Sequence, residues 1–105
     1  MAFNRLVKKL TVENLWIYIL RMLAEKPMYA YEMKKALMER FDVHVAMITV
    51  YIVLYKMVGE DLIKEVERVS PLGKPSRKYY GVTSKGEEAL TLGRRFLEET
   101  FKKLS

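Results

Sequence analysis

The sequence has 105 residues, half of them hydrophobic, which is the length of one domain and too apolar a composition for general disorder. Lys and Arg outnumber Asp and Glu by 19 to 13, and the resulting net charge of +6 favours a polyanionic partner. The sequence has no Cys and one His, His44, which excludes disulfides, thiol nucleophiles and zinc fingers, so we expect no metal and no cofactor.

The first two predicted elements are helices. Residues 2–10 carry one apolar helical stripe, formed by Phe3, Leu6, Val7 and Leu10. So short a helix needs a surface to pack on, either its own domain or a second copy. Thr11 is predicted to cap the second helix, which runs from Val12 until Lys26 and Pro27 end it. We assign Trp16 to the core in preference to a ligand-stacking role.

Two further helices are predicted over residues 29–41 and 46–58. The helix over residues 29–41 is expected to point the apolar side chains of Ala30, Met33, Leu37 and Phe41 inward. The second is unusually apolar, and the core face expected for it consists of Val50, Val53, Leu54 and Met57. Its opposite face holds Ile48, Thr49, Ile52, Tyr55 and Lys56.

The next segment is a predicted hairpin. Residues 60–69 fit a helical period as well as a strand. A strand is favoured because the Tyr- and Val-rich run 78–82 needs a pairing partner, with residues 70–76 as the connection. The cations that flank this turn, with no acid between them, are Lys74, Arg77 and Lys78. Such a tip suits a nucleic-acid-binding wing that reaches a phosphate backbone, although charged turns are commonly just solvated.

The chain ends in a long helix, predicted over residues 84–104 with Thr83 as its N-cap. Apolar side chains cover nearly half its circumference, more than one small domain can bury along the whole length, so we expect a second subunit to cover them. The side chains assigned to dimerisation are Leu90, Phe96, Leu97, Phe101 and Leu104.

The order of these elements predicts a mainly α (α+β) fold, a winged helix-turn-helix with a C-terminal dimerisation helix. Residues 1–83 would form the DNA-binding domain and residues 84–105 the dimerisation helix. Residues 46–58 would enter the major groove while the wing touches phosphate. The side chains assigned to DNA contact are Tyr31, Thr49, Tyr51, Lys56, Lys74, Arg77 and Lys78. For Tyr31 and Tyr51, packing beneath the wing is the open alternative.

Three stretches resemble the PadR-like transcriptional regulators (phenolic-acid-decarboxylase-type repressors). Residues 27–33 resemble the family's P-x-h-G-Y-E-L, residues 49–57 its T-L-Y-x-x-L-x-R-L recognition helix, and residues 77–86 its R-K-Y-Y-x-L-T-x-x-G. The resemblance covers about residues 12–104. It implies a homodimer, joined by the terminal helices, that binds promoter DNA. Some members bind small aromatic or drug-like molecules between subunits, so the resemblance also suggests a small-molecule effector.

The chain departs from the family pattern at four positions. The family usually has Gly where Ala30, Ile48 and Asp61 stand, and an acidic residue where Val58 stands. The exposed face of the predicted recognition helix also carries no Arg, Asn or Gln, which are the side chains best suited to bidentate base contacts.

The function expected from these observations is sequence-specific regulation of transcription, with repression favoured, by a homodimer on double-stranded DNA. A winged-helix protein-interaction module and a low-specificity architectural DNA binder are the alternatives. An enzyme is not expected, because no nucleophile pairing, phosphate loop or perturbed carboxylate pair is present. With no long apolar run and no signal peptide, we expect a cytoplasmic protein without membrane contact.

Overall fold

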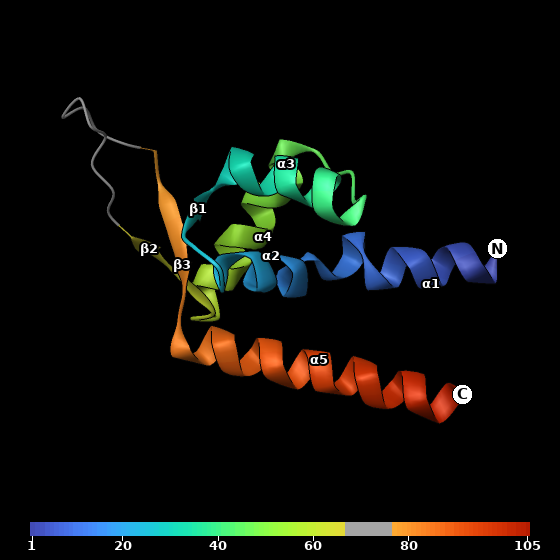
Figure 1. The fold of residues 1–105 in the computed structure, drawn as a ribbon. Helices are drawn as coiled ribbons and strands as arrows, with labels where there is room; N and C mark the ends of the chain where they lie inside the picture. The colour runs from blue at the N-terminus through green and yellow to red at the C-terminus, as the bar shows by residue number, and fades with distance from the viewer. Residues whose placement is uncertain (67–76) are drawn as a thin grey trace.

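The computed structural model describes residues 1–66 and 77–105. Within them the elements are α1 (Ala2–Leu10), the 3-10 turn η1 (Val12–Asn14), α2 (Leu15–Leu23), β1 (Met28–Tyr29), α3 (Ala30–Phe41), α4 (Met47–Gly59), β2 (Ile63–Val66), β3 (Tyr79–Val82) and α5 (Ser84–Leu104). The small sheet stands at one end of α2, α3 and α4, while α1 and α5 extend toward the other end (Figure 1). The predicted mainly α fold with a winged-helix sheet is confirmed.

The core is built around α2, which contacts α3, α4, α5 and β3. The largest fully buried side chains are Leu15, Ile19, Leu20, Met22, Met33, Leu37, Leu54, Met57, Ile63 and Val50. The inward faces predicted for α3 and α4 are therefore the ones that pack. Trp16 packs against this core but remains partly exposed.

The sheet has three antiparallel strands in the order β1-β3-β2. Of the strand predicted over residues 60–69, Ile63–Val66 forms β2, while residues 67–69 lie outside the described residues. The strand predicted over residues 78–82 is β3, with Ile63 opposite Val82 and Val66 opposite Tyr79. The strand β1 was not predicted, because a two-residue strand has no periodicity and residue 29 was assigned to the following helix. The hairpin connection predicted over residues 70–76 lies outside the described residues.

The predicted role of Thr11 as a side-chain cap is wrong. Its hydroxyl bonds backward, and together with two further side chains it caps the carbonyl end of α1. The three bonds run from Thr11 Oγ1 to the Val7 carbonyl at 2.6 Å, from Asn14 Nδ2 to the Lys9 carbonyl at 2.5 Å, and from Tyr18 Oη to the Leu10 carbonyl at 2.6 Å. Although none of its residues is buried, α1 thus has a fixed direction relative to α2.

The predicted cap at the start of α5 is confirmed. The Thr83 hydroxyl accepts from the Gly86 N–H at 3.0 Å and donates to the Asp61 carbonyl at 2.6 Å. The Thr83 N–H donates to the Leu62 carbonyl at 3.1 Å. These bonds hold the first turn of α5 against the segment between α4 and β2. There Asp61 takes a left-handed φ of 60°, a conformation that favours glycine.

Candidate nucleic-acid interface

Three segments that are far apart in the sequence meet around one hollow. The hollow has a volume of about 380 Å³ and lies between the start of α3, the exposed side of α4 and the start of β3. The residues that line it are Tyr29, Ala30, Tyr31, Tyr51, Arg77, Lys78 and Tyr80. Four of the residues assigned to DNA contact, Tyr31, Tyr51, Arg77 and Lys78, are therefore neighbours in space.

Local chemistry fixes the start of α3 beside this hollow. The Glu32 carboxylate accepts from the Tyr29 N–H at 3.3 Å, which satisfies one of the free donors at the helix N-terminus. Tyr31 follows directly, and its side chain is exposed. The Pro-x-x-x-Tyr-Glu stretch at residues 27–32 thus turns the chain from β1 into α3 and leaves Tyr31 at the surface.

Arg77 is held in place by an aromatic pair. Its guanidinium carbon lies 4.7 Å from the centroid of the Tyr29 ring, and the Tyr29 ring meets the Tyr79 ring edge-on at 5.4 Å. Tyr29 and Tyr79 stand opposite each other in the β1–β3 pairing. A cation–π contact at an exposed site contributes roughly 0.5–1 kcal/mol. Arg77 remains exposed, so the contact orients a guanidinium toward solvent.

Lys78 has an intramolecular partner on the neighbouring strand. Its Nζ lies 3.7 Å from a carboxylate oxygen of Glu65 on β2, and both side chains are largely exposed. Exposed ion pairs of this kind contribute roughly 0.2–1 kcal/mol. Lys78 can therefore exchange Glu65 for a phosphate at little cost. Lys74, the third predicted cation of the wing, lies outside the described residues.

The exposed side of α4 is apolar. Opposite the buried core face, Ile48 is 66%, Ile52 50% and Tyr55 83% exposed. Thr49 is half-buried and Lys56 is exposed, and at 100° per residue both lie at the edge of this side. Ile48, Ile52 and Tyr55 are therefore the central exposed residues that our assignment of DNA contacts left out. Their helical period alone places them there, whereas the assignment of DNA contacts favours the polar side chains Thr49 and Lys56.

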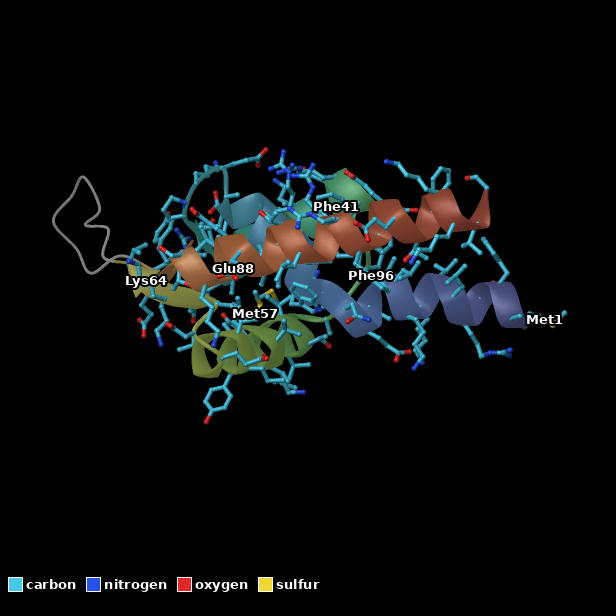
Figure 2. The ribbon with its side chains drawn as sticks, turned by 90° about the horizontal axis from the view of Figure 1, so that it is seen from below. Met1, Phe41, Met57, Lys64, Glu88 and Phe96 are labelled. Atoms are coloured by element: carbon cyan, nitrogen blue, oxygen red, sulfur yellow. The ribbon has the colours of Figure 1, made fainter. Side chains whose placement is uncertain are left out.

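A second exposed apolar surface lies on the two terminal helices. Four of the side chains assigned to dimerisation are exposed on α5, namely Phe96, Leu97, Phe101 and Leu104. The stripe predicted on α1 is exposed as well. Both helices extend to the same end of the molecule (Figure 2). The assignment of Leu90 needs correction, because it is 7% exposed and belongs to the core of its own chain.

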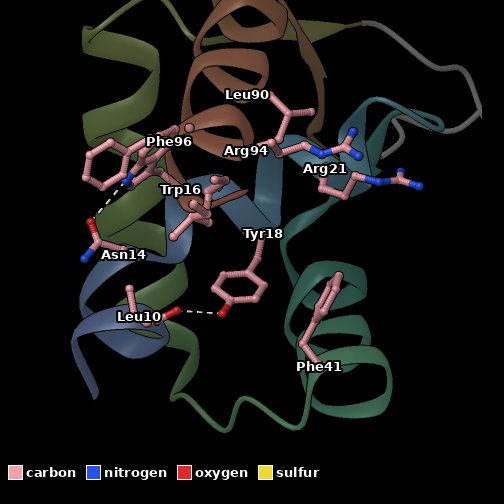
Figure 3. Close-up of a pocket in the computed structure, with 12 residues that line it drawn as sticks. Leu10, Asn14, Trp16, Tyr18, Arg21, Phe41, Leu90, Arg94 and Phe96 are labelled. Carbon is pink, nitrogen blue, oxygen red and sulfur yellow. Dashed lines mark hydrogen bonds between the residues drawn. The ribbon is translucent and has the colours of Figure 1, made fainter. Parts of the chain in front are cut away.

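A groove of about 570 Å³ runs between α2 and α5 (Figure 3). The residues around it are Leu10, Asn14, Trp16, Ile17, Tyr18, Arg21, Phe41, Leu90, Gly93, Arg94, Phe96 and Leu97. The Trp16 Nε1 donates to Asn14 at 3.2 Å, and burial raises the pKa of the Tyr18 hydroxyl. A Cβ on Gly93 would lie 2.8 Å from the Ile17 side chain, so glycine lets the two helices approach here.

Among the described residues, no group of three or more His, Cys, Asp or Glu side chains could hold a metal ion. No helix in that part of the chain combines the length and hydropathy needed to cross a membrane.

Comparisons with known proteins identify chains that are similar to this one. The model of the transcriptional regulator PadR-like family matches residues 19–92. A Streptococcus transcriptional regulator is 31% identical, with a TM-score of 0.73 over 86% of this chain and 87% of that chain. A PadR-like transcriptional regulator from Bacillus cereus strain ATCC 14579 is 30% identical, with a TM-score of 0.73 over 86% and 89% of the two chains.

Another solved structure is that of Bacillus subtilis PadR in complex with operator DNA. It is 22% identical, with a TM-score of 0.64 over 73% of this chain and 44% of that chain, so it shares the fold. Comparison with curated proteins gave no match.

Proposed function

Because the chain belongs to the PadR-like family of transcriptional regulators, we propose that it represses transcription by binding operator DNA sequence-specifically as a homodimer. The observation that carries this proposal is the hollow where exposed tyrosines of α3 and α4 meet the cations Arg77 and Lys78. Family membership makes the protein a regulator of transcription and not an enzyme. Its proposed compartment is the cytoplasm.

The proposed DNA contacts divide between two elements. The helix α4 would enter the major groove, with Thr49 and Lys56 reaching a thymine methyl and a guanine edge from the borders of its exposed side. Arg77, Lys78 and Lys74 of the wing would contact phosphate, which fixes position but carries no base identity. Tyr31 and Tyr51, beside these cations, would contact the sugar-phosphate backbone.

The proposed dimer rests on the exposed apolar side chains of α1 and α5. Side chains as exposed as Phe96 and Phe101 gather on a helix that extends away from the core, and a second copy would cover them. In the proposed division, residues 1–83 bind DNA and residues 84–105 dimerise. Gly86 and Leu90 at the start of α5 are nevertheless buried with the preceding helices, so the dimerising part would begin after them.

The groove between α2 and α5 is the proposed binding site of a small-molecule effector. Phe96 and Leu97 line the groove and are also proposed to dimerise, so a bound aromatic molecule would act on the subunit arrangement. Trp16, the only Trp, also lines it, and quenching of its fluorescence would report such binding directly.

A second candidate function is a winged-helix protein-interaction module. The apolar exposed side of α4 favours it, because a protein partner could bury Ile48, Ile52 and Tyr55. The net charge of +6 and the cations beside Tyr51 favour DNA.

One selection experiment separates these functions. Duplexes with a random central segment are incubated with the protein at physiological salt, and the retained molecules are sequenced. The proposed regulator enriches a two-fold symmetric consensus. An architectural DNA binder retains DNA with weak enrichment, and a protein-interaction module retains none.

A further inference from the structure

The exposed side of α4 is one continuous apolar strip. Its members are Ile48, Tyr51, Ile52, Tyr55 and Val58. Single exposed apolar residues are common on protein surfaces, but five on one side of a 13-residue helix form a patch of the kind that marks an interaction surface.

The charges around this strip indicate the chemistry of its partner. The helix α4 contains no acidic residue, and Lys56 lies at one border of the strip. At the other border Tyr51 shares the hollow with Arg77 and Lys78. The strip therefore has an apolar centre and cationic borders. Its partner should have a recess with apolar groups inside it and anionic groups along its edges. The major groove of DNA has this arrangement where thymine methyl groups lie between the two phosphate backbones.

The polar groups on α4 are too few for readout by paired hydrogen bonds. Arg, Asn and Gln do not occur in the helix, so it has no side chain for a bidentate adenine contact, and Lys56 is its one candidate for a guanine edge. The direct contact that remains for an aliphatic side chain in the major groove is with the thymine 5-methyl group.

We propose that Ile48, Ile52 and Tyr55 read thymine methyl groups, and that each operator half-site carries thymines beneath them. This proposal rests on the proposed function, since it assigns the base specificity of the same helix. It makes the three central apolar residues the specificity determinants, with Thr49 and Lys56 contributing from the borders of the strip.

The test replaces thymine by deoxyuridine, one position at a time, in the selected duplex. Deoxyuridine lacks only the 5-methyl group, so base pairing and phosphate charge are unchanged. At each contacted position the dissociation constant should rise about three- to fourfold, as expected for one buried methyl group. Substitution outside the half-sites should leave it unchanged.

Two protein variants assign the effect to the strip. Ile48→Ala and Ile52→Ala should each bind the thymine duplex more weakly and lose the discrimination against deoxyuridine at one position. Both positions are exposed and alanine favours helices, so the fold is retained. Lys56→Ala is the matched control, which should weaken binding to thymine and deoxyuridine duplexes by the same factor.

The outcomes separate this inference from the function on which it rests. If no duplex is bound, the proposed function fails, and the inference fails with it. If the protein selects a consensus but binds thymine and deoxyuridine duplexes equally at every position, the inference is overturned and the regulator stands. It is also overturned if both alanine variants keep the affinity and discrimination of the original protein, as they would if this side bound a protein.

Discussion

A Cβ placed on Gly86 would overlap the backbone carbonyl oxygen of Leu62 and would lie 2.8 Å from the Val82 side chain. Glycine is therefore the only residue that fits where the first turn of α5 meets the segment entering β2. Thr83 joins the same two segments through its bond to Asp61. The stretch at residues 77–86 that resembles the family ends in Thr-x-x-Gly. These two residues explain that ending physically, because they allow α5 to pack against the sheet.

Gly86→Ala should lower the free energy of unfolding by about 3 kcal/mol, because a backbone carbonyl cannot move aside as a side chain does. Gly59→Ala is the matched control, since a Cβ at that last position of α4 meets nothing within 4 Å. It should raise the free energy of unfolding by about 0.5–1 kcal/mol. Urea unfolding measures both, and equal stability of the two variants would contradict the close approach at Gly86.

Leu97→Glu should convert the proposed dimer into monomers, because a carboxylate would replace an apolar side chain on the surface shared with the second copy. Arg95→Gln is the control, since it also lowers the net charge by one but lies on the opposite side of α5. Sedimentation velocity distinguishes the two results.

A second α5 variant keeps the test decisive if Leu97→Glu does not fold. Phe101 is 74% exposed and lies beyond the part of α5 that packs on the core, so Phe101→Glu should fold and also be monomeric. Folded dimers of unchanged affinity in both variants would refute the terminal-helix dimer.

Glu65→Gln should strengthen binding to every DNA sequence, because it releases Lys78 from its partner at 3.7 Å and removes one carboxylate near phosphate. Lys78→Ala, alone or with Lys74→Ala, should weaken binding to all sequences alike. It should also flatten the slope of log affinity against log salt by up to about 0.9 for each phosphate that the variant no longer neutralises. Fluorescence anisotropy titrations at several salt concentrations measure both effects. Glu65→Gln without effect would place Lys78 away from the DNA.

Stability should fall at alkaline pH through Tyr80. Burial raises the pKa of its hydroxyl above the ordinary value of 10.0. The unfolded chain therefore ionises first, so the stabilisation is complete below pH 10.0 and is lost as the pH rises through the raised pKa. Tyr80→Phe should reduce this alkaline loss while leaving the fold intact at pH 7. An identical pH profile in the variant would contradict the assignment to Tyr80.

Much of the fold could be predicted because its signals are local. The apolar period and the Thr83 cap placed α5 at residues 84–104, as observed. The prediction of Thr11 as a cap is wrong because its hydroxyl donates to the carbonyl of Val7, four residues earlier. The sequence does not show which of these two bonds a threonine will form. The strand β1 could not be predicted because it exists only through its pairing with β3.

For the candidate site, the sequence indicates which types of residue take part, but it indicates less well how they are arranged in space. Arg77 could be identified as a wing cation, but its contact with Tyr29 depends on the pairing of two strands some fifty residues apart. Leu90 was assigned to the dimer because the width of an apolar arc does not say which part its own chain covers. Thr49 was favoured on α4 because it is polar, while the structure exposes Ile48 and Ile52 more fully.

The central claim is that a dimer reads two half-sites through its paired α4 helices. Changing the spacing between the half-sites tests this claim most directly. A two-fold dimer holds its recognition helices about one DNA turn, or a whole multiple of it, apart. Inserting about five base pairs, half a turn, between the half-sites of the selected duplex turns one half-site to the opposite face. We predict that the affinity then falls to that of a single half-site. An affinity that does not depend on the spacing would contradict the account.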